Sequence, residues 1–233
     1  GASQGRFDTT VGPLVELWGF GAPGRTDAPN GDAVAAALAK TGQRQGVQLD
    51  GATAGKTRPD AQIYLAGIGK GYGADKVAKA LEHLGFSDYL VEIGGDLYVS
   101  GSNPSGSSWQ IGIETPNAQD RSVADVVGLS NVGLATSGDY RNYFEVDGAR
   151  FSHLIDPQTG YPVKHRTASA TVIAQNAMLA DAWSTAMLIL GREPGLELAA
   201  QHDIAVRFVD RALASGDTGF QTFASDAFNA MTS

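Results

Sequence analysis

The chain has 233 residues, 42% of them hydrophobic and 18% charged, which is the composition of a globular protein and not of a disordered one. Its net charge of −8 and the lack of any Lys or Arg run argue against binding to nucleic acids or to anionic membranes. The absence of Cys excludes disulfides, thiolate metal sites and cysteine nucleophiles. The sequence has 30 Gly, well above the usual share of roughly 7%, which suggests close approach of the backbone at several places.

The first predicted elements are short. We expect a packed loop or the approach to a strand over Phe7–Gly21. A helix is predicted for Asn30–Thr41, because a capping residue begins it and Gly42 follows its end. Strands are predicted at Val47–Asp50 and Gln62–Ile68.

The next helix is predicted at Asp75–Leu84, where Val77, Leu81 and Leu84 recur on one face and Gly85 ends the pattern. Strands are then expected at Tyr89–Ile93, just after Asp96, and at Trp109–Glu114, Ala168–Ala174 and Ala205–Val209, with helices at Ala177–Leu190 and Glu193–Gln201.

The strongest local signal is Asp147-Gly148, a two-residue turn that predicts a hairpin of Tyr143–Val146 with Arg150–Ile155. The tail 214–233 is small and polar and is expected to fray. No repeat or linker interrupts the chain, so a single α+β domain over residues 1–233 is predicted. The longest apolar stretch, Ala177–Leu190, is too short to span a bilayer.

Two glycine-rich segments are similar to phosphate-binding loops. Gly51–Thr57 has one residue too few between its glycines for a P-loop, and Pro59 follows where a helix should begin, so a plain surface loop is favoured. In Gly67–Gly73, alternating glycines lead into a helix, where backbone amides and Lys70 suit a phosphate group. Taken alone, a tight strand–helix connection explains this second pattern as well.

Two further patterns bear on chemistry. Asp181 and Thr185 are four residues apart in a predicted helix, so both side chains lie on one face and offer the hard oxygen ligands that Mg²⁺ prefers. His153, at a strand end beside turn residues, is the best general-base candidate among the four histidines. Each pattern alone also fits a structural role: a solvated Asp181, a Thr185 bonded to a backbone carbonyl, and a structural or exposed His153.

Five sets of segments, in the same order, resemble the ApbE family of flavin transferases. They are Phe7–Leu14 with Leu17–Gly21, Gly67–Tyr72 with Gly94–Asp96, Thr136–Tyr140, Phe151–His153 through Pro162, and Asp181 with Ala182 and Thr185. The resemblance implies an ApbE/T-fold-like α+β fold, a mostly antiparallel sheet packed with helices in a single compact unit. It also implies an FAD:protein FMN transferase, which with Mg²⁺ transfers FMN from FAD to a threonine hydroxyl of an acceptor protein and releases AMP.

The same resemblance implies the site residues. The metal ligands would be the carbonyl of Gly67 and the side chains of Asp181 and Thr185, with Ser184 as a neighbour. His153 would lie nearest the transferred phosphate as the catalytic group. Contacts with FAD would fall at Arg6, Phe7, Asp8, Lys70, His153 and Leu154. The glycines at 67, 69 and 71 would place backbone against metal and cofactor, where a Cβ atom would intrude.

Two features depart from the family pattern. Tyr64 stands where the family commonly has an Asp that contacts FAD. Family members also carry a further N-terminal segment that covers the flavin, whereas this sequence begins at Gly1, directly upstream of Phe7 and Asp8. Many relatives are exported and some are lipoproteins, so we expect a periplasmic location with a removed N-terminal lipoprotein signal.

Two other functions would use the same residues. An FAD pyrophosphatase would use water in place of the threonine and release FMN and AMP. A non-catalytic protein would only bind FAD. Because the nucleophile comes from outside the enzyme, the sequence does not separate the transferase from the hydrolase.

Overall fold

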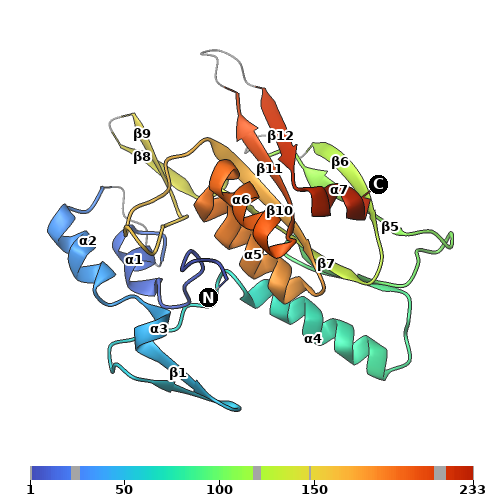
Figure 1. Ribbon diagram of the computed structural model, residues 1–233, viewed down its shortest axis with the longest axis horizontal. Helices are drawn as coiled ribbons and strands as arrows, with labels where there is room; N and C mark the ends of the chain where they lie inside the picture. Colours follow the sequence, from blue (N-terminus) through green and yellow to red (C-terminus); the bar gives the residue numbers. More distant parts are fainter. Residues whose placement is uncertain (1, 22–26, 118–121, 147, 213–218, 233) are drawn as a thin grey trace. The chain divides into compact units, whose positions relative to one another are not determined.

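The structure, a computed structural model, describes residues 2–21, 27–117, 122–146, 148–212 and 219–232 (Figure 1). The chain divides into two compact units. Unit 1 comprises Gly1–Leu65 and Arg141–Lys164, and unit 2 comprises Ala66–Tyr140 and His165–Ser233. The paired strands of the described residues are antiparallel throughout, which confirms the predicted α+β class. The single domain over residues 1–233 stays a prediction.

In its described residues, unit 1 consists of short helices and hairpins. These are α1 (Gly12–Leu17), α2 (Gly31–Leu38), α3 (Gln43–Gly46), the hairpin β1 (Val47–Asp50) with β2 (Thr53–Lys56), and the hairpin β8 (Tyr143–Val146) with β9 (Ala149–Ser152). The predicted helix α2 is confirmed, with Asn30 accepting a hydrogen bond from the Ala33 amide at 2.9 Å. The predicted hairpin around Asp147-Gly148 is confirmed, but its second strand ends at Ser152 and not at Ile155, and Asp147 of its turn lies outside the described residues.

Two expectations for unit 1 are wrong. Residues 12–17, expected as loop or strand, are the helix α1, because Pro13 in the first turn has no amide to leave unpaired and favours a helical start. The helix then places Leu14 and Trp18 in the core, where the Trp18 indole donates to the Gly160 carbonyl at 2.8 Å. The predicted strand Gln62–Ile68 is an irregular segment leading into a turn.

Unit 2 is built on a six-stranded sheet of order β12-β11-β10-β7-β4-β3 (Figure 1). Its strands are β3 (Tyr89–Ile93), β4 (Asp96–Ser100), β7 (Val132–Gly138), β10 (Thr167–Ala174), β11 (Ala205–Arg211) and β12 (Phe220–Ala224). A separate hairpin joins β5 (Trp109–Glu114) to β6 (Val123–Leu129). The helices of this unit are α4 (Gly69–His83), α5 (Ala177–Leu190), α6 (Arg192–His202) and α7 (Asp226–Thr232).

The two faces of this sheet bury different partners. Helix α5 packs on β7 and β10 and against α4 on one face. On the other face Leu134 and Ile173 join a core with apolar residues of β5, β6 and α7. Because side chains alternate along a strand, odd-numbered residues of β7 face α5, and a Cβ atom on Gly133 would collide with the Ala177 backbone at 2.3 Å.

Most predicted elements of unit 2 are confirmed, and helix α5 begins and ends at the predicted residues. Helix α4 begins six residues before the predicted Asp75, and β6, β7 and β12 were not predicted. The tail was expected to fray. Residues 213–218 lie outside the described residues, but the described part beyond them forms β12 and α7, with Phe228 buried in the core.

Candidate functional site

Helix α5 carries the two side chains that the sequence suggests as metal ligands. Asn176 caps the helix by accepting from the Leu179 amide at 2.8 Å. One turn further on, Asp181 is buried with 3% of its surface exposed, and Thr185 follows after another turn and is half-buried. The predicted placement of both on one helix face is confirmed; their role as ligands stays a prediction.

The Asp181 carboxylate is directed at the first turn of α4. Its Oδ2 atom accepts a hydrogen bond from the Gly71 amide at 3.1 Å. Gly71 is the third residue of α4, whose first backbone bond runs from the Tyr72 amide to the Ile68 carbonyl, so the Gly71 amide has no acceptor within the helix. The Asp181 carboxylate supplies that acceptor from α5. This contact holds Asp181 of α5 at the first turn of α4, which begins two residues after Gly67.

Lys70 forms an ion pair with the buried Asp96 beside this contact. The Lys70 ammonium donates to the Asp96 carboxylate at 2.6 Å, and Asp96 is 1% exposed while the lysine side chain is 43% exposed. Burial raises the pKa of Asp96 well above its ordinary value; the neighbouring charge of Asp181 raises it further, and Lys70 offsets part of the effect. Two carboxylates crowded in this way favour a cation between or beside them.

A group of hydroxyls completes this region. The Ser137 hydroxyl, on β7, lies 2.9 Å from that of Ser184 and 3.3 Å from that of Thr185. The Ser184 hydroxyl donates to the Asp181 carbonyl at 2.9 Å. Ser137 therefore connects the sheet to the helix face that holds both candidate ligands.

Gly71, near the start of α4, has a packing role in the protein itself. A Cβ atom on Gly71 would lie 2.2 Å from the Ala177 carbonyl oxygen, so this glycine allows α4 and α5 to approach closely. The expected approach of glycines 67, 69 and 71 to metal and cofactor stays a prediction. A Cβ atom on Gly69 meets nothing within 4 Å in the described protein. The protein itself thus requires a glycine at 71 but not at 69.

His153 lies in unit 1, directly after β9. Its Nδ1 atom is 3.1 Å from the Asn142 carbonyl, which only accepts, so Nδ1 is assigned as the protonated donor in this bond. The ring also makes an edge contact with Phe20. With Nδ1 used in this way, Nε2 is the ring nitrogen that would take up a proton from a substrate.

The other predicted FAD residues of unit 1 take part in its internal structure. The Arg6 guanidinium bonds to the Asp156 carboxylate, and its Nε atom is buried without a hydrogen-bond partner. The Asp8 carboxylate accepts from the amides of Thr10, at 2.7 Å, and Gln43, at 2.9 Å. These bonds fix the backbone of residues 6–10.

Three more residues of unit 1 bear on the prediction. Phe7 is partly buried and Leu154 is 5% exposed. Tyr64, at the position where the family commonly has Asp, is 37% exposed, and its amide donates to the Thr9 carbonyl at 2.6 Å. The Tyr64 ring is thus accessible for stacking.

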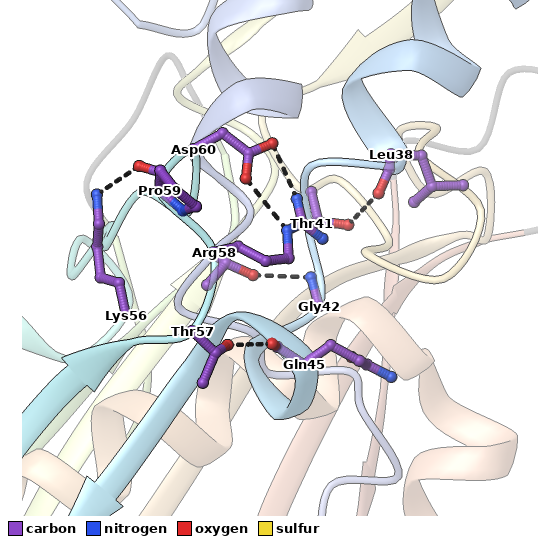
Figure 2. A network of polar contacts seen from close by, with 10 residues as sticks. Leu38, Thr41, Gly42, Gln45, Lys56, Thr57, Arg58, Pro59 and Asp60 are labelled. Carbon is purple, nitrogen blue, oxygen red and sulfur yellow. Dashed lines mark hydrogen bonds and ion pairs between the residues drawn. The ribbon is translucent and has the colours of Figure 1, made fainter.

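The first glycine-rich segment is not a phosphate loop. Gly51 lies in the turn of the β1–β2 hairpin, and β2 extends to Lys56. Lys56 donates to the Pro59 carbonyl at 2.9 Å, and Thr57 donates to the Gln45 carbonyl. Both bonds are drawn as dashed lines in Figure 2. A P-loop leads into a helix, whereas this segment leads into the strand β2. The P-loop is therefore excluded, and the predicted surface loop is the turn and second strand of a hairpin.

The residues of unit 2 fit a magnesium ion by the chemistry of their oxygens. Among the residues that the structure describes, no group of three or more His, Asp or Glu side chains would hold a metal. The set of Asp181, Thr185 and Gly67 is of another kind, with one carboxylate, one hydroxyl and one carbonyl. Mg²⁺ takes few protein ligands of this type and fills its remaining positions with water and substrate phosphates.

Comparison with known proteins identifies the family. The profile of the ApbE family matches residues 1–208. The chain is 44% identical to an FAD:protein FMN transferase of Haemophilus influenzae, covering 99% of this chain and 67% of the relative, and 41% identical to one of Vibrio cholerae, covering 98% and 67%. The chain belongs to the ApbE family.

Solved structures of ApbE proteins agree with this fold. The flavin transferase ApbE from Vibrio cholerae has a TM-score of 0.86 at 39% identity, covering 99% of this chain and 72% of that one. The apo form of the Pseudomonas stutzeri flavinyl transferase ApbE has a TM-score of 0.86 at 43% identity, covering 99% and 70%. The predictions of the ApbE family, of its fold and of an enzyme of this class are confirmed. The chain spans about two thirds of the length of the curated relatives.

Two structural residues of the site were not assigned a role from the sequence. Ser137 and Asp96 both lie in segments that carry the ApbE resemblance, and that membership is the signal that points to them. Their contacts with α5 and with Lys70 depend on the strand order, which the sequence patterns did not provide.

None of the described helices is long and apolar enough to cross a membrane.

Proposed function

We propose that the protein is a Mg²⁺-dependent FAD:protein FMN transferase that modifies a threonine of an acceptor protein and releases AMP. The relatives named above carry the name FAD:protein FMN transferase, and the solved structure from Vibrio cholerae carries the name flavin transferase. The observation that carries the proposal for this chain is the contact of Asp181 with the Gly71 amide, which brings the carboxylate of α5 to the first turn of α4, just after Gly67 in the chain.

The reaction is a phosphoryl-type transfer. The threonine oxygen forms a bond to the FMN phosphorus of FAD, the pyrophosphate bond to the AMP phosphate breaks, and AMP leaves with the bonding electron pair. The threonine proton goes to a base. Catalysis of such a transfer rests on positioning and on stabilising negative charge on the phosphate oxygens.

Each residue has one role in this proposal. Asp181, Thr185 and the Gly67 carbonyl hold the Mg²⁺, which when bound neutralises charge on the phosphates. Lys70, positioned by its bond to Asp96, adds a positive charge beside them. His153 accepts the threonine proton at Nε2, since its Nδ1 atom is directed at the Asn142 carbonyl.

A mass-spectrometric assay tests the proposal. The protein is incubated with FAD, Mg²⁺ and an acceptor protein, and the acceptor is examined for addition of FMN, with AMP measured in parallel. We expect an FMN adduct on threonine and an equal amount of AMP, both dependent on Mg²⁺. Release of FMN and AMP without an adduct would instead indicate a pyrophosphatase, and intact FAD would indicate a binding protein.

The role of His153 has its own test. His153→Gln keeps a polar side chain but removes the basic nitrogen, and loss of a general base is expected to lower kcat by about 10²–10⁴-fold. His202→Gln, on the last turn of α6 in unit 2, is the matched control and should leave kcat unchanged. A kcat for His153→Gln within tenfold of the wild type would refute the base assignment.

The partners and location follow from the same proposal. The substrates are FAD and an acceptor protein with a target threonine, and the expected place of action is the periplasm. Fractionation of cells that express the full-length protein tests the location, and recovery in the cytoplasm would contradict it.

A further inference from the structure

We infer that Ser137 is a positioning residue that turns the Thr185 hydroxyl so that its lone pairs face the metal. The inference rests on the proposed function, because it concerns the Mg²⁺ that Thr185 would bind. The hydroxyl contacts that carry it join β7 to α5. Both elements belong to unit 2 and pack on each other; Figure 1 labels both.

The donor in each of these hydrogen bonds can be assigned by starting from the bond between Ser184 and the Asp181 carbonyl. A hydroxyl has a single proton to donate, and a carbonyl oxygen only accepts. The Ser184 hydroxyl is 2.9 Å from the Asp181 carbonyl, so its proton is used there. In its contact with Ser137, at 2.9 Å, Ser184 must therefore accept, and Ser137 must donate.

The same reasoning fixes the last bond. Since the Ser137 proton is directed at Ser184, the Ser137 oxygen accepts in its contact with Thr185, at 3.3 Å, and Thr185 donates. The protons run in one direction, from Thr185 through Ser137 and Ser184 to the backbone of Asp181. The Thr185 oxygen is left with its lone pairs for a cation.

This arrangement solves a problem that a hydroxyl ligand has. A threonine in a helix tends to donate to a carbonyl of the preceding turn or to rotate freely, and a neutral hydroxyl is a good ligand only when its proton points away from the cation. Groups that orient a metal ligand in this way typically contribute 10–100-fold to metal affinity. Ser137 provides the acceptor from a different element, the strand β7, so the Thr185 rotamer is held by the fold.

The position of Ser137 provides a matched control. Thr136 precedes it on β7, but its side chain faces the opposite side of the sheet, where its hydroxyl lies 2.9 Å from that of Thr171. Thr136→Val removes a hydroxyl of the same strand without touching α5. Ser137→Ala removes the acceptor of Thr185, and Ser137→Thr keeps it.

The test is Mn²⁺ binding, followed by the EPR signal of free Mn²⁺ with the purified protein. We expect Ser137→Ala to weaken Mn²⁺ binding by about 10–100-fold, and Ser137→Thr and Thr136→Val to stay close to the wild type. In the transfer assay, Ser137→Ala should need correspondingly more Mg²⁺ for half-maximal rate and should regain most of its kcat at saturating Mg²⁺.

Each outcome decides between separate claims. If the wild type binds Mn²⁺ and transfers FMN while Ser137→Ala binds Mn²⁺ within twofold as well, the inference is wrong and the proposed function stands. If Thr136→Val is weakened as much as Ser137→Ala, the effect is a general loss of β7 structure and the inference is also wrong. If the wild type neither binds Mn²⁺ nor transfers FMN, the proposed function fails and the inference fails with it.

Discussion

Replacing Gly71 by Ala should destabilise the protein because α4 and α5 meet at this residue. A Cβ atom there would lie 2.2 Å from the Ala177 carbonyl oxygen, 2.6 Å from its carbon and 2.8 Å from the Met178 Cα atom, all backbone atoms that cannot rotate away. The two helices would have to separate until each of these distances exceeds 3.0 Å. The separation would also stretch the bond from the Gly71 amide to Asp181.

The size of the effect follows from three terms. Overpacking of this kind costs about 1–3 kcal/mol, and loss of a hydrogen bond to a carboxylate costs about 1.5–3 kcal/mol. Alanine in place of glycine in a helix stabilises the folded state by about 1 kcal/mol, which offsets part of this cost. The net loss in free energy of unfolding is then about 1.5–5 kcal/mol, which for a protein of this size lowers Tm by roughly 3–20 °C.

Thermal unfolding followed by far-UV circular dichroism, without metal, measures this loss. Gly69→Ala is the matched control, since it lies in the same helix turn and its Cβ atom meets nothing within 4 Å. We expect the control to keep or slightly raise Tm. A Gly71→Ala protein as stable as Gly69→Ala would refute the reasoning, because the close approach of the helices would then carry no energetic weight.

Two further predictions concern the stability of unit 2. Burial lowers the pKa of His165, while Asp139 and Asp210 oppose the shift. Below pH 6.5 the unfolded chain therefore takes up a proton that the folded protein resists, and the free energy of unfolding should fall as the pH drops through 6.5. His165→Leu should flatten this part of a pH profile measured by chemical denaturation, and an unchanged slope would contradict the assignment. Arg192→Met should lower the free energy of unfolding, measured by urea denaturation, by about 3 kcal/mol, because it leaves the buried Asp210 carboxylate without the Arg192 Nε donor at 2.8 Å. A loss below about 1 kcal/mol would show that this ion pair is not important for stability.

The sequence predicted those parts of the fold that depend on neighbours along the chain. Helix α5 was predicted with its observed ends because its apolar run ends at Gly191, and α2 because Asn30 precedes it. Helix α1 was missed because its Gly and Pro content is also typical of loops. The core contacts of Leu14 and Trp18, which decide in favour of the helix, are not visible in a local pattern.

The candidate site divides in the same way. The spacing of Asp181 and Thr185 was sufficient to place them on one helix face. The link from Asp181 to Gly71, and the approach of Ser137 to Thr185, depend on how α4, α5 and β7 pack, and β7 itself was not predicted as a strand. Tertiary contacts between distant segments were therefore the part that local patterns did not provide.

FMN transfer by the Asp181→Asn protein tests the central claim most directly. The amide keeps an oxygen that accepts from the Gly71 amide, so the fold should persist, but it removes the negative charge that binds Mg²⁺. With FAD, an acceptor protein and increasing Mg²⁺, mass spectrometry should find the FMN adduct for the wild type and none for Asp181→Asn. An adduct formed by the variant within tenfold of the wild-type rate, or formed by the wild type without Mg²⁺, would contradict the account.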